Sequence, residues 1–485
     1  MRFVIAKAIF LVAAFCLAAA IASSAQAFTS LFSFDGANGA YPQVGLVQGI
    51  HGGLYGSTQA GGSYNSGTIF EVTTGGELTT LHSFCSPTDC NDGYNPSPGL
   101  VLATDGNLYG MTMAGGAFGG GTVFKITPEG ELTTLYAFCS QANCMDGATP
   151  QAGLVQADNG NFYGTTSSGG TGGIGTGTIF EITPQGKLTT LYNFLCTLGS
   201  CINGESPEGA LLQATNGNFY GTTFGGGAHD AGTVFEITPT GKLTTLYGFC
   251  AQANCTDGAA PHAGLIQASN GYFYGTTEGN GCASLCGTVF KMTPTGKLIS
   301  LYNFCECADG FYPAAALIQA TDGNFYGTTE NGGARGGGAL FRITPEGKTT
   351  TLYTFCSQYN CDDGFQPSSS LLQATDGTLY GTTSSGGTGV ACIEGCGTVY
   401  SFSIGLGPFV ETLPTSGKVG AKVIILGNNL TGATSVSFNG TTATFTVVSD
   451  TEITATVPAA ATTGRVAVTT AGGALKSNVV FRVTE

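Results

Sequence analysis

Residues 99–138 read GLVLATDGNLYGMTMAGGAFGGGTVFKITPEGELTTLYAF and form one complete copy of a unit that the chain repeats. Four apolar or β-branched runs, bounded by Gly, Pro or Asp, lie at 100–102, 108–110, 122–127 and 132–138. Such runs predict four short strands, which we call a, b, c and d. Asp105-Gly106 suits a type I′ hairpin between strands a and b, and Pro128 presets a turn between strands c and d. Each unit is therefore predicted to be a four-stranded antiparallel meander.

The unit occurs seven times. Its Tyr-Gly pair in strand b begins at Tyr55, Tyr109, Tyr163, Tyr220, Tyr274, Tyr326 and Tyr380. The seventh copy stops after its strand c at 397–402, whereas residues 28–34 match the missing strand d. A ring explains this division, because pairing the two pieces removes a free sheet edge. We predict an all-β protein in which residues 28–402 form a seven-bladed β-propeller closed by the N-terminal strand.

The chain changes character after the repeats. Residues 403–407 form a Gly-rich linker, and residues 408–485 contain neither cysteine nor the repeat. Apolar and polar residues alternate there over short stretches such as 422–426 and 466–468. This pattern predicts a small immunoglobulin-like β-sandwich.

Residues 1–27 have the features of a signal peptide. Arg2 and Lys7 precede an apolar stretch at 9–21, and Ala25-Gln26-Ala27 supplies small residues for cleavage. The apolar stretch is too short for a durable membrane span, so no membrane insertion is expected after cleavage. The mature protein is predicted to be secreted, extracellular or periplasmic, with attachment to a cell surface left open.

Sixteen cysteines follow the signal peptide and lie close together in pairs. The pairs are Cys85/Cys90, Cys139/Cys144, Cys196/Cys201, Cys250/Cys255, Cys282/Cys286, Cys305/Cys307, Cys356/Cys361 and Cys392/Cys396. A zinc site needs four converging ligands, but these pairs are spread along the repeats and the chain has only 4 histidines. We predict local disulfides and no metal site, and the pairing of Cys305 with Cys307 stays open because so small a ring is strained.

Charge and motifs exclude several function classes. The formal net charge is −15, and only 9% of residues are charged, which argues against nucleic acid and anionic membranes as partners. No Ser-His-Asp order, HExxH, phosphate loop or nucleotide fingerprint occurs, so no catalytic residue and no cofactor is predicted. An Asp or Asn recurs in each loop between strands d and a, at Asp35, Asp92, Asp146, Asn203, Asp257, Asp309 and Asp363. We interpret it as a turn residue rather than a calcium ligand.

Two resemblances extend this interpretation. The motif D-G-N-x-Y-G-T-T followed by G-T-V-F-K-I-T-P-x-G-K-L-T-T-L-Y-x-F resembles the GloVer tandem repeat of exported bacterial choice-of-anchor proteins, over residues 28–402. The segment with Pro414-Thr415-Ser416-Gly417 and Val436-Ser437-Phe438-Asn439-Gly440 resembles an IPT/TIG domain. These resemblances imply an immunoglobulin-like sandwich on an exported bacterial protein. They imply no particular activity.

The variable loops are the expected binding surface. In a meander the b–c and d–a loops share one face, and here they vary in sequence while the a–b and c–d turns are uniform. Six residues in the b–c loops replace the Gly, Ser or Ala of other repeats and are the candidate ligand-binding residues: His229, Asp230, Glu278, Glu330, Arg335 and Glu394.

We therefore predict a secreted, non-catalytic binding or adhesion module whose partner is a glycan or a cell-surface protein. One alternative is a polysaccharide-acting enzyme with carboxylates at the channel mouth, and another is a structural surface or matrix protein. Carboxylates that converge at the channel mouth would favour the enzyme, and a broad aromatic and polar groove would favour binding. The oligomeric state stays open.

Overall fold

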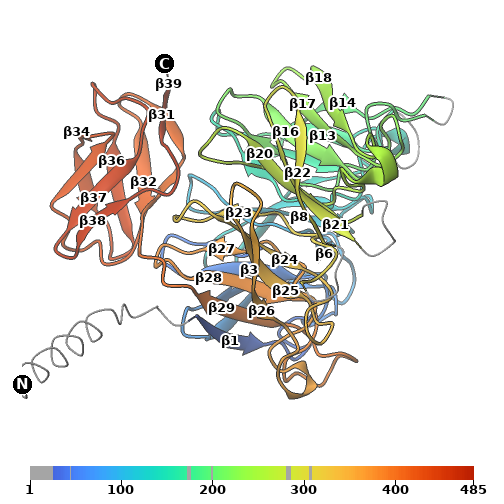
Figure 1. The fold of residues 1–485 in the computed structure, drawn as a ribbon, viewed down its shortest axis with the longest axis horizontal. Helices are drawn as coiled ribbons and strands as arrows, with labels where there is room; N and C mark the ends of the chain where they lie inside the picture. The colour runs from blue at the N-terminus through green and yellow to red at the C-terminus, as the bar shows by residue number, and fades with distance from the viewer. Residues whose placement is uncertain are drawn as a thin grey trace, which may run out of the picture.

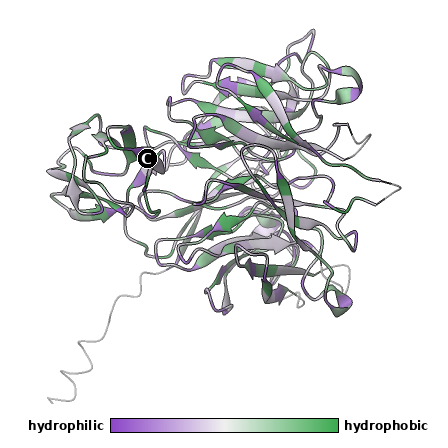
Figure 2. Cartoon of the chain, turned by 90° about the horizontal axis from the view of Figure 1, so that it is seen from above, coloured by the Kyte–Doolittle hydropathy of each residue, from purple (hydrophilic) through white to green (hydrophobic). Residues whose placement is uncertain are grey.

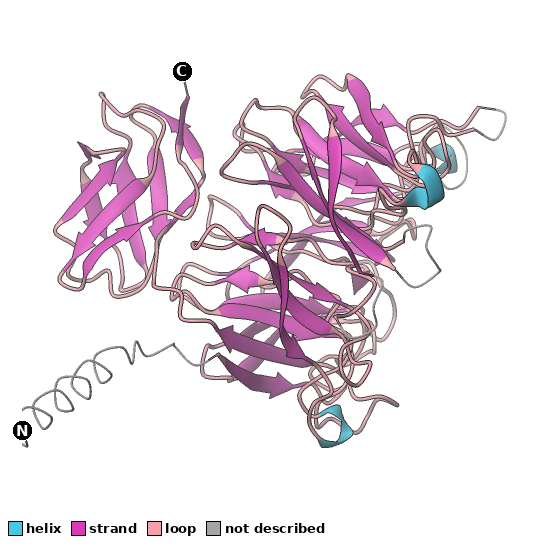
Figure 3. Ribbon diagram, viewed as in Figure 1, coloured by secondary structure: helices cyan, strands magenta, loops and turns pink. Residues whose placement is uncertain are grey.

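The computed structural model describes residues 26–43, 45–171, 176–197, 200–279, 286–304 and 309–484. These residues are all-β, apart from three one-turn helices, η1 (Ala142–Cys144), η2 (Ala253–Cys255) and η3 (Tyr359–Cys361) (Figures 1 and 3). Within the described ranges no helix has the length and apolar character needed to cross a membrane. The predicted signal peptide lies outside the described residues except for its last two positions.

Seven antiparallel sheets follow one another along the chain, and we number them by repeat. Hydrophobic segments run through their strands (Figure 2). The strands of repeats 1 to 3 are β2 (Val47–Gln48), β3 (Leu54–Thr58), β4 (Thr68–Val72) and β5 (Leu78–Ser83); β6 (Tyr94–Pro96), β7 (Val101–Leu102), β8 (Leu108–Ala114), β9 (Thr122–Ile126) and β10 (Leu132–Ala137); and β11 (Val155–Gln156), β12 (Phe162–Thr166), β13 (Thr178–Ile182) and β14 (Leu188–Asn193).

The strands of repeats 4 to 7 are β15 (Leu212–Gln213), β16 (Phe219–Thr223), β17 (Thr233–Ile237) and β18 (Leu243–Gly248); β19 (Ile266–Gln267), β20 (Phe273–Thr277), β21 (Gly287–Met292) and β22 (Leu298–Phe304); β23 (Ile318–Gln319), β24 (Phe325–Thr329), β25 (Ala339–Ile343) and β26 (Thr349–Thr354); and β27 (Leu372–Gln373), β28 (Leu379–Thr383) and β29 (Thr398–Ser403). Strand a is thus only two residues long in each repeat, and strand b begins with the aromatic or leucine side chain that precedes each Tyr-Gly pair.

The N-terminal strand completes the sheet of repeat 7. Strand β1 (Ala27–Ser33) pairs antiparallel with β29, with Phe28 opposite Phe402 and Ser33 opposite Thr398. The Phe28 ring stacks on Tyr353 of repeat 6 at a centroid distance of 4.1 Å. The N-terminal strand and the last three strands of the repeats therefore form one four-stranded sheet.

Apolar clusters join each repeat to the next. Six of them bury side chains from consecutive repeats, as where Phe138 and Phe180 of repeats 2 and 3 meet at 5.3 Å. A further cluster joins repeat 7 to repeat 1 and contains Tyr380, Leu54 and Phe70, all nearly inaccessible to solvent. The first and last repeats are thus packed together by the same kind of contact as their neighbours.

A glutamine in strand a ties most repeats to the one before. Its side-chain oxygen accepts a hydrogen bond from the backbone N–H of the residue two positions after strand a in the preceding repeat. The bonds run from Thr104 to Gln156, Asp158 to Gln213, Thr215 to Gln267, Ser269 to Gln319, Thr321 to Gln373 and Thr375 to Gln48, at 2.8 to 3.0 Å. We call these six bonds the glutamine belt. It includes the junction between repeats 7 and 1, and in repeat 2 the glutamine is replaced by Leu102.

The C-terminal segment forms an immunoglobulin-like sandwich. Its strands are β30 (Glu411–Leu413), β31 (Ser416–Lys418), β32 (Lys422–Leu426), β33 (Ser435–Phe438), β34 (Thr441–Thr442), β35 (Phe445–Val447), β36 (Glu452–Thr456), β37 (Val466–Thr470), β38 (Gly473–Lys476) and β39 (Arg482–Thr484). Sheet β30-β32-β36-β35 faces sheet β34-β33-β37-β38, and β31 pairs with β39. Ile425, Phe438 and Val468 belong to the buried core.

This sandwich lies against the a–b turns of the repeats. The Phe409 N–H donates to the Thr375 carbonyl at 3.0 Å, and the Thr451 hydroxyl donates to the Ile50 carbonyl at 2.8 Å. The one-turn helices belong to d–a loops and lie on the side of the sheets away from the sandwich (Figure 3). The variable loop face is therefore opposite the C-terminal domain.

Deleting residues 28–33 tests the role of β1. We expect the deletion variant to aggregate or to lose cooperative unfolding, because β29 would then present an unpaired edge and Tyr353 would lose its stacked ring. Circular dichroism melting and light scattering measure this. The substitution Thr29→Ser, at an exposed position of the same strand, is the control. A deletion variant that melts like the parent would contradict the prediction.

Substituting Gln48 tests the belt at the junction of repeats 7 and 1. Gln48→Leu removes the acceptor of the Thr375 N–H and leaves that donor without its partner, so we expect a loss of about 1–3 kcal/mol in the free energy of unfolding. Urea denaturation measures the loss. Gln48→Glu, which keeps an acceptor oxygen, should lose less, and equal stability of Gln48→Leu and the parent would refute the role.

Candidate functional site

Two positions vary from repeat to repeat beside strands a and b. The first follows the proline that precedes strand a and is occupied by Gln43, Ser97, Gln151, Glu208, His262, Ala314 and Ser368. The second directly follows strand b, except in repeat 2, where the longer β8 includes it. It is occupied by Gln59, Met113, Ser167, Phe224, Glu278, Glu330 and Ser384. The two positions of one repeat are neighbours, because the Gln151 amide donates to the Ser167 hydroxyl at 2.9 Å.

A residue in a left-handed backbone conformation lies before the proline and positions the residues at both variable positions. It precedes the proline in every repeat, with φ between 50° and 59°, and is occupied by Tyr41, Asn95, Thr149, Ser206, Ala260, Tyr312 and Gln366. In repeat 5 the Ala260 N–H donates to the Ala231 carbonyl of repeat 4 at 2.8 Å, and the Ala260 carbonyl accepts from the Glu278 N–H at 3.1 Å. In repeat 6 the Glu330 N–H donates likewise to the Tyr312 carbonyl at 2.9 Å. Non-glycine residues adopt this conformation at a cost in energy, and such strain is often found at functional sites.

The first variable position opens into a cavity of about 520 Å³ that residues from all seven repeats line. Its polar side chains are Gln43, Gln151, Glu208, His262, Glu278, Glu330, Ser368 and Ser370. Small residues at the start of strand a let neighbouring repeats approach closely. A Cβ atom on Gly264 would lie 2.6 Å from the Ala210 carbonyl oxygen of the adjacent repeat, so glycine is required there.

Carboxylates and one histidine gather on the wall formed by repeats 4, 5 and 6. The Nε2 atom of His262 lies 3.4 Å from Oε2 of Glu208, whose side chain is only 15% exposed. Burial raises the pKa of the Glu208 carboxyl, His262 opposes this, and the charge of Glu278 adds to it. Burial also raises the pKa of Glu330, again reinforced by Glu278 and opposed by His262.

The same wall has an aromatic neighbour. The Phe224 ring is 37% exposed and meets the His262 ring edge to face at a centroid distance of 6.4 Å. Among the described residues that line the cavity there is no Lys or Arg. The cavity is thus acidic, with a half-exposed aromatic ring beside it.

The structure brings together two of the six candidate residues predicted from the sequence. Glu278 and Glu330 line the cavity. His229, Asp230, Arg335 and Glu394 are exposed on b–c loops and are not among its lining residues. Sequence reasoning missed Glu208 and His262. The recurring proline could have identified them. The residue that follows it varies between repeats, whereas the sequence around the proline recurs.

Disulfide bonds hold the loops of the variable face. Six of the predicted pairs are bonded: Cys85–Cys90, Cys139–Cys144, Cys196–Cys201, Cys250–Cys255, Cys356–Cys361 and Cys392–Cys396. All six are local, as the close spacing of the cysteines predicted. The predicted pair Cys305/Cys307 lies outside the described residues.

The predicted bond between Cys282 and Cys286 stays a prediction, because Cys282 lies outside the described residues. Cys286 itself lies directly before β21, where its side chain is buried.

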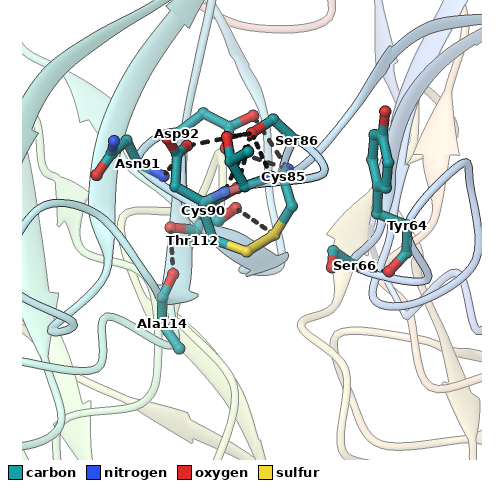
Figure 4. The surroundings of a disulfide bond; sticks show 12 residues. Tyr64, Ser66, Cys85, Ser86, Cys90, Asn91, Asp92, Thr112 and Ala114 are labelled. Carbon is teal, nitrogen blue, oxygen red and sulfur yellow. Dashed lines mark hydrogen bonds between the residues drawn. A yellow bond between two sulfur atoms is a disulfide. The ribbon is translucent and has the colours of Figure 1, made fainter.

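The recurring aspartates form hydrogen bonds within their own d–a loops. In the loop after β5 the Cys85 N–H donates to Asp92 at 3.1 Å (Figure 4). In the loop after β10 the Ser140 N–H donates to Asp146 at 2.9 Å. These bonds agree with the interpretation of the aspartates as turn residues.

One group in the described part of the chain has metal-ligand spacing, and it consists of Cys196, Cys201 and Glu205. Its two cysteines are joined to each other, so their sulfur atoms are engaged in a covalent bond. Burial raises the pKa of Glu205, and the charge of Asp230 adds to this shift. The candidate Asp230 is thus near Glu205, at the edge of repeat 4.

Solved structures resemble this fold at low sequence identity. A fungal alcohol oxidase in complex with copper has 13% identity and a TM-score of 0.50, and the alignment covers 95% of this chain and 99% of that one. An oxidoreductase described as a glucose dehydrogenase from Thermus thermophilus has 17% identity and a TM-score of 0.41, covering 78% and 100%. The PQQ-bound aldose sugar dehydrogenase of Streptomyces coelicolor has 16% identity and a TM-score of 0.39, covering 78% and 98%. At these identities the likeness concerns the fold alone.

Sequence families give the firmer relationship. Comparison with curated proteins gives no match. The model of the Gloeobacter/Verrucomicrobia repeat matches residues 19–203 and 177–400, and that of the IPT/TIG domain matches residues 409–483. The first model thus covers the repeats that form the seven sheets. The chain belongs to the Gloeobacter/Verrucomicrobia repeat family and has an IPT/TIG domain after the repeats.

Proposed function

We propose that the seven sheets are the blades of a closed propeller, and that the protein is a secreted binding module which takes up a glycan at the axial cavity. Repeat and IPT/TIG domains fit a binding or adhesion module. Closure is supported by the β1–β29 pairing, by the apolar cluster between repeats 7 and 1 and by the Thr375–Gln48 bond. Secretion is supported by the disulfides, which persist in oxidising compartments.

The convergence of Glu208, His262, Glu278 and Glu330 in one cavity carries this proposal. These side chains come from three repeats and from two variable positions, so four separate departures from the repeat meet at one place. A volume of about 520 Å³ lies in the usual range for ligand sites, roughly 300–1,000 Å³. Residues that differ between repeats and converge in one cavity can bind a ligand together. Scattered loop residues cannot.

The chemistry of the wall selects the class of glycan. Carboxylates accept hydrogen bonds from sugar hydroxyl groups and attract amino groups. Phe224 offers an apolar face for the ring of a sugar. An anionic sugar would meet three carboxylates with no Lys or Arg in the described lining to offset them. We therefore expect a neutral or amino-bearing glycan rather than a uronic acid polymer.

A second candidate is a polysaccharide-acting enzyme at the same cavity. Glycoside hydrolysis uses a pair of carboxyl groups, one protonated as the acid and one ionised. Burial raises the pKa of Glu208 and of Glu330, which suits an acid, and Glu278 is near enough to both to influence them. The same residues would therefore serve either role, and turnover distinguishes the two.

Glutamine substitutions test the proposed site. We expect residues 28–485 to bind neutral or amino-bearing glycans on an array. Glu278→Gln and Glu330→Gln should each weaken binding roughly tenfold or more, because each removes a charged acceptor. Isothermal titration calorimetry measures the change. Glu394→Gln, in an exposed b–c loop outside the cavity, is the matched control and should bind like the parent.

Three outcomes would contradict this binding function. Turnover of a glycan that disappears in Glu278→Gln or Glu330→Gln would establish the enzyme instead. Glycan binding that both variants retain at parental affinity would place the ligand elsewhere on the loop face. If no glycan on the array binds, the proposal that the ligand is a glycan is wrong.

The stability of the protein should depend on pH through Glu330. Its pKa is raised in the folded state, so its protonated form is favoured by folding. Its stabilising contribution is therefore present at low pH and is lost as the pH rises through the raised pKa. We expect Glu330→Gln to be more stable than the parent at pH 7, with a smaller difference at pH 4. Urea denaturation at both values tests this, with Glu394→Gln as control, and a difference that does not change with pH would contradict it.

A further inference from the structure

The C-terminal domain bonds to one equivalent position in four of the seven repeats. That position lies two residues after strand a and supplies the N–H groups of the glutamine belt. The Ile50 carbonyl accepts from the Thr451 hydroxyl at 2.8 Å, and the Thr215 carbonyl accepts from the Arg482 guanidinium at 2.6 Å. Asp158 and Thr375 are the other two residues at this position that the domain contacts.

Thr375 accepts two bonds from the domain, one from the Phe409 N–H to its carbonyl at 3.0 Å and one from the Asn428 amide to its hydroxyl at 2.7 Å. The Asp158 carboxylate accepts from the Ser416 hydroxyl and forms an ion pair with Arg482. All four contacts thus fall on the a–b side, at the same place in repeats 1, 3, 4 and 7.

Two of these four residues depart from the rest of the set. The position is Ser or Thr in five repeats, namely Thr104, Thr215, Ser269, Thr321 and Thr375. Ile50 and Asp158 are the exceptions, and the domain contacts both of them. A surface made of repeats offers several nearly equivalent docking positions. Residues that differ between repeats, such as Ile50 and Asp158, can distinguish one docking position from the others.

A third departure lies next to Ile50. Leu102 stands where six repeats have the belt glutamine, and it has no acceptor oxygen for the repeat before it. Leu102 is buried in an apolar cluster that also contains Ile50 of repeat 1 and Leu426, Leu413 and Ile424 of the C-terminal domain. The domain therefore packs its apolar side chains at the single junction where the belt has a leucine in place of its glutamine.

We propose that Ile50, Leu102 and Asp158 specify where the C-terminal domain docks on the repeats. Ile50 and Leu102 bury the apolar side chains of β30 and β32, and Asp158 fixes the opposite end of the domain through Ser416 and Arg482. An apolar pair in repeats 1 and 2 and a carboxylate in repeat 3 define one orientation on a surface that is otherwise nearly repetitive. This assignment is independent of whether the cavity binds a glycan.

Restoring the repeat residues tests the assignment in the full chain. The variant Ile50→Thr, Leu102→Gln, Asp158→Thr carries at each site a residue that other repeats carry, so the sheets should keep their fold. We expect chymotrypsin to cleave at Leu406 and Phe409 roughly tenfold faster, because the lost apolar contact and ion pair no longer hold Phe409 against Thr375. Small-angle X-ray scattering should show a larger radius of gyration.

The matched control is Ser269→Thr, Thr321→Ser, which exchanges residues at the same position in repeats 5 and 6. This control should be cleaved at the parental rate. Should the triple variant fail to fold, Arg482→Gln tests the assignment from the domain side and should also speed cleavage. Parental cleavage in a folded triple variant, or parental cleavage in Arg482→Gln when only that variant folds, would overturn the assignment.

Discussion

The hydrogen bonds at Thr375 connect three parts of the chain that lie far apart in sequence. Its N–H donates to Gln48 of repeat 1, its hydroxyl accepts from Asn428, and its carbonyl accepts from Phe409. Thr375 therefore belongs both to the junction of the last and first repeats and to the surface that contacts the C-terminal domain. Because the cavity needs all seven repeats around it, its shape depends on this junction as much as on the side chains that line it.

The frame and the site use different positions of the same repeat. Belt glutamines, buried aromatics and loop aspartates recur because each repeat must pack against its neighbours in the same way. The positions after the proline and at the end of strand b are free of this requirement, and several of them line the cavity. Variation is therefore tolerated where Glu208, His262, Glu278 and Glu330 lie, and a rigid backbone with a recurring left-handed residue holds them in place.

Much of the fold follows from local rules that one sequence displays. The repeat spacing, the turn dipeptides and the strand at residues 28–34 predicted the sheets and the pairing of β1 with β29. The cavity was harder to predict, because which loop residues converge depends on how the seven repeats pack against one another. Glu278 and Glu330 stand out in the sequence as departures from the repeat, whereas Glu208 and His262 follow a proline at a position that varies among the repeats. Asp158 and Leu102 were missed because their partners come from a domain that the repeat pattern does not include.

The two kinds of link that stabilise the repeats differ greatly in how far they reach along the chain. Each disulfide joins cysteines only four or five residues apart, so it can form as soon as its own loop is oxidised. The β1–β29 pairing joins Ala27 to Ser403, and such distant contacts form slowly and late. Oxidation of the loops and pairing of the two ends are thus separable events. The loops can acquire their final covalent structure before β1 meets β29, whereas the cavity, which all seven repeats line, is complete only after the last repeat has met the first.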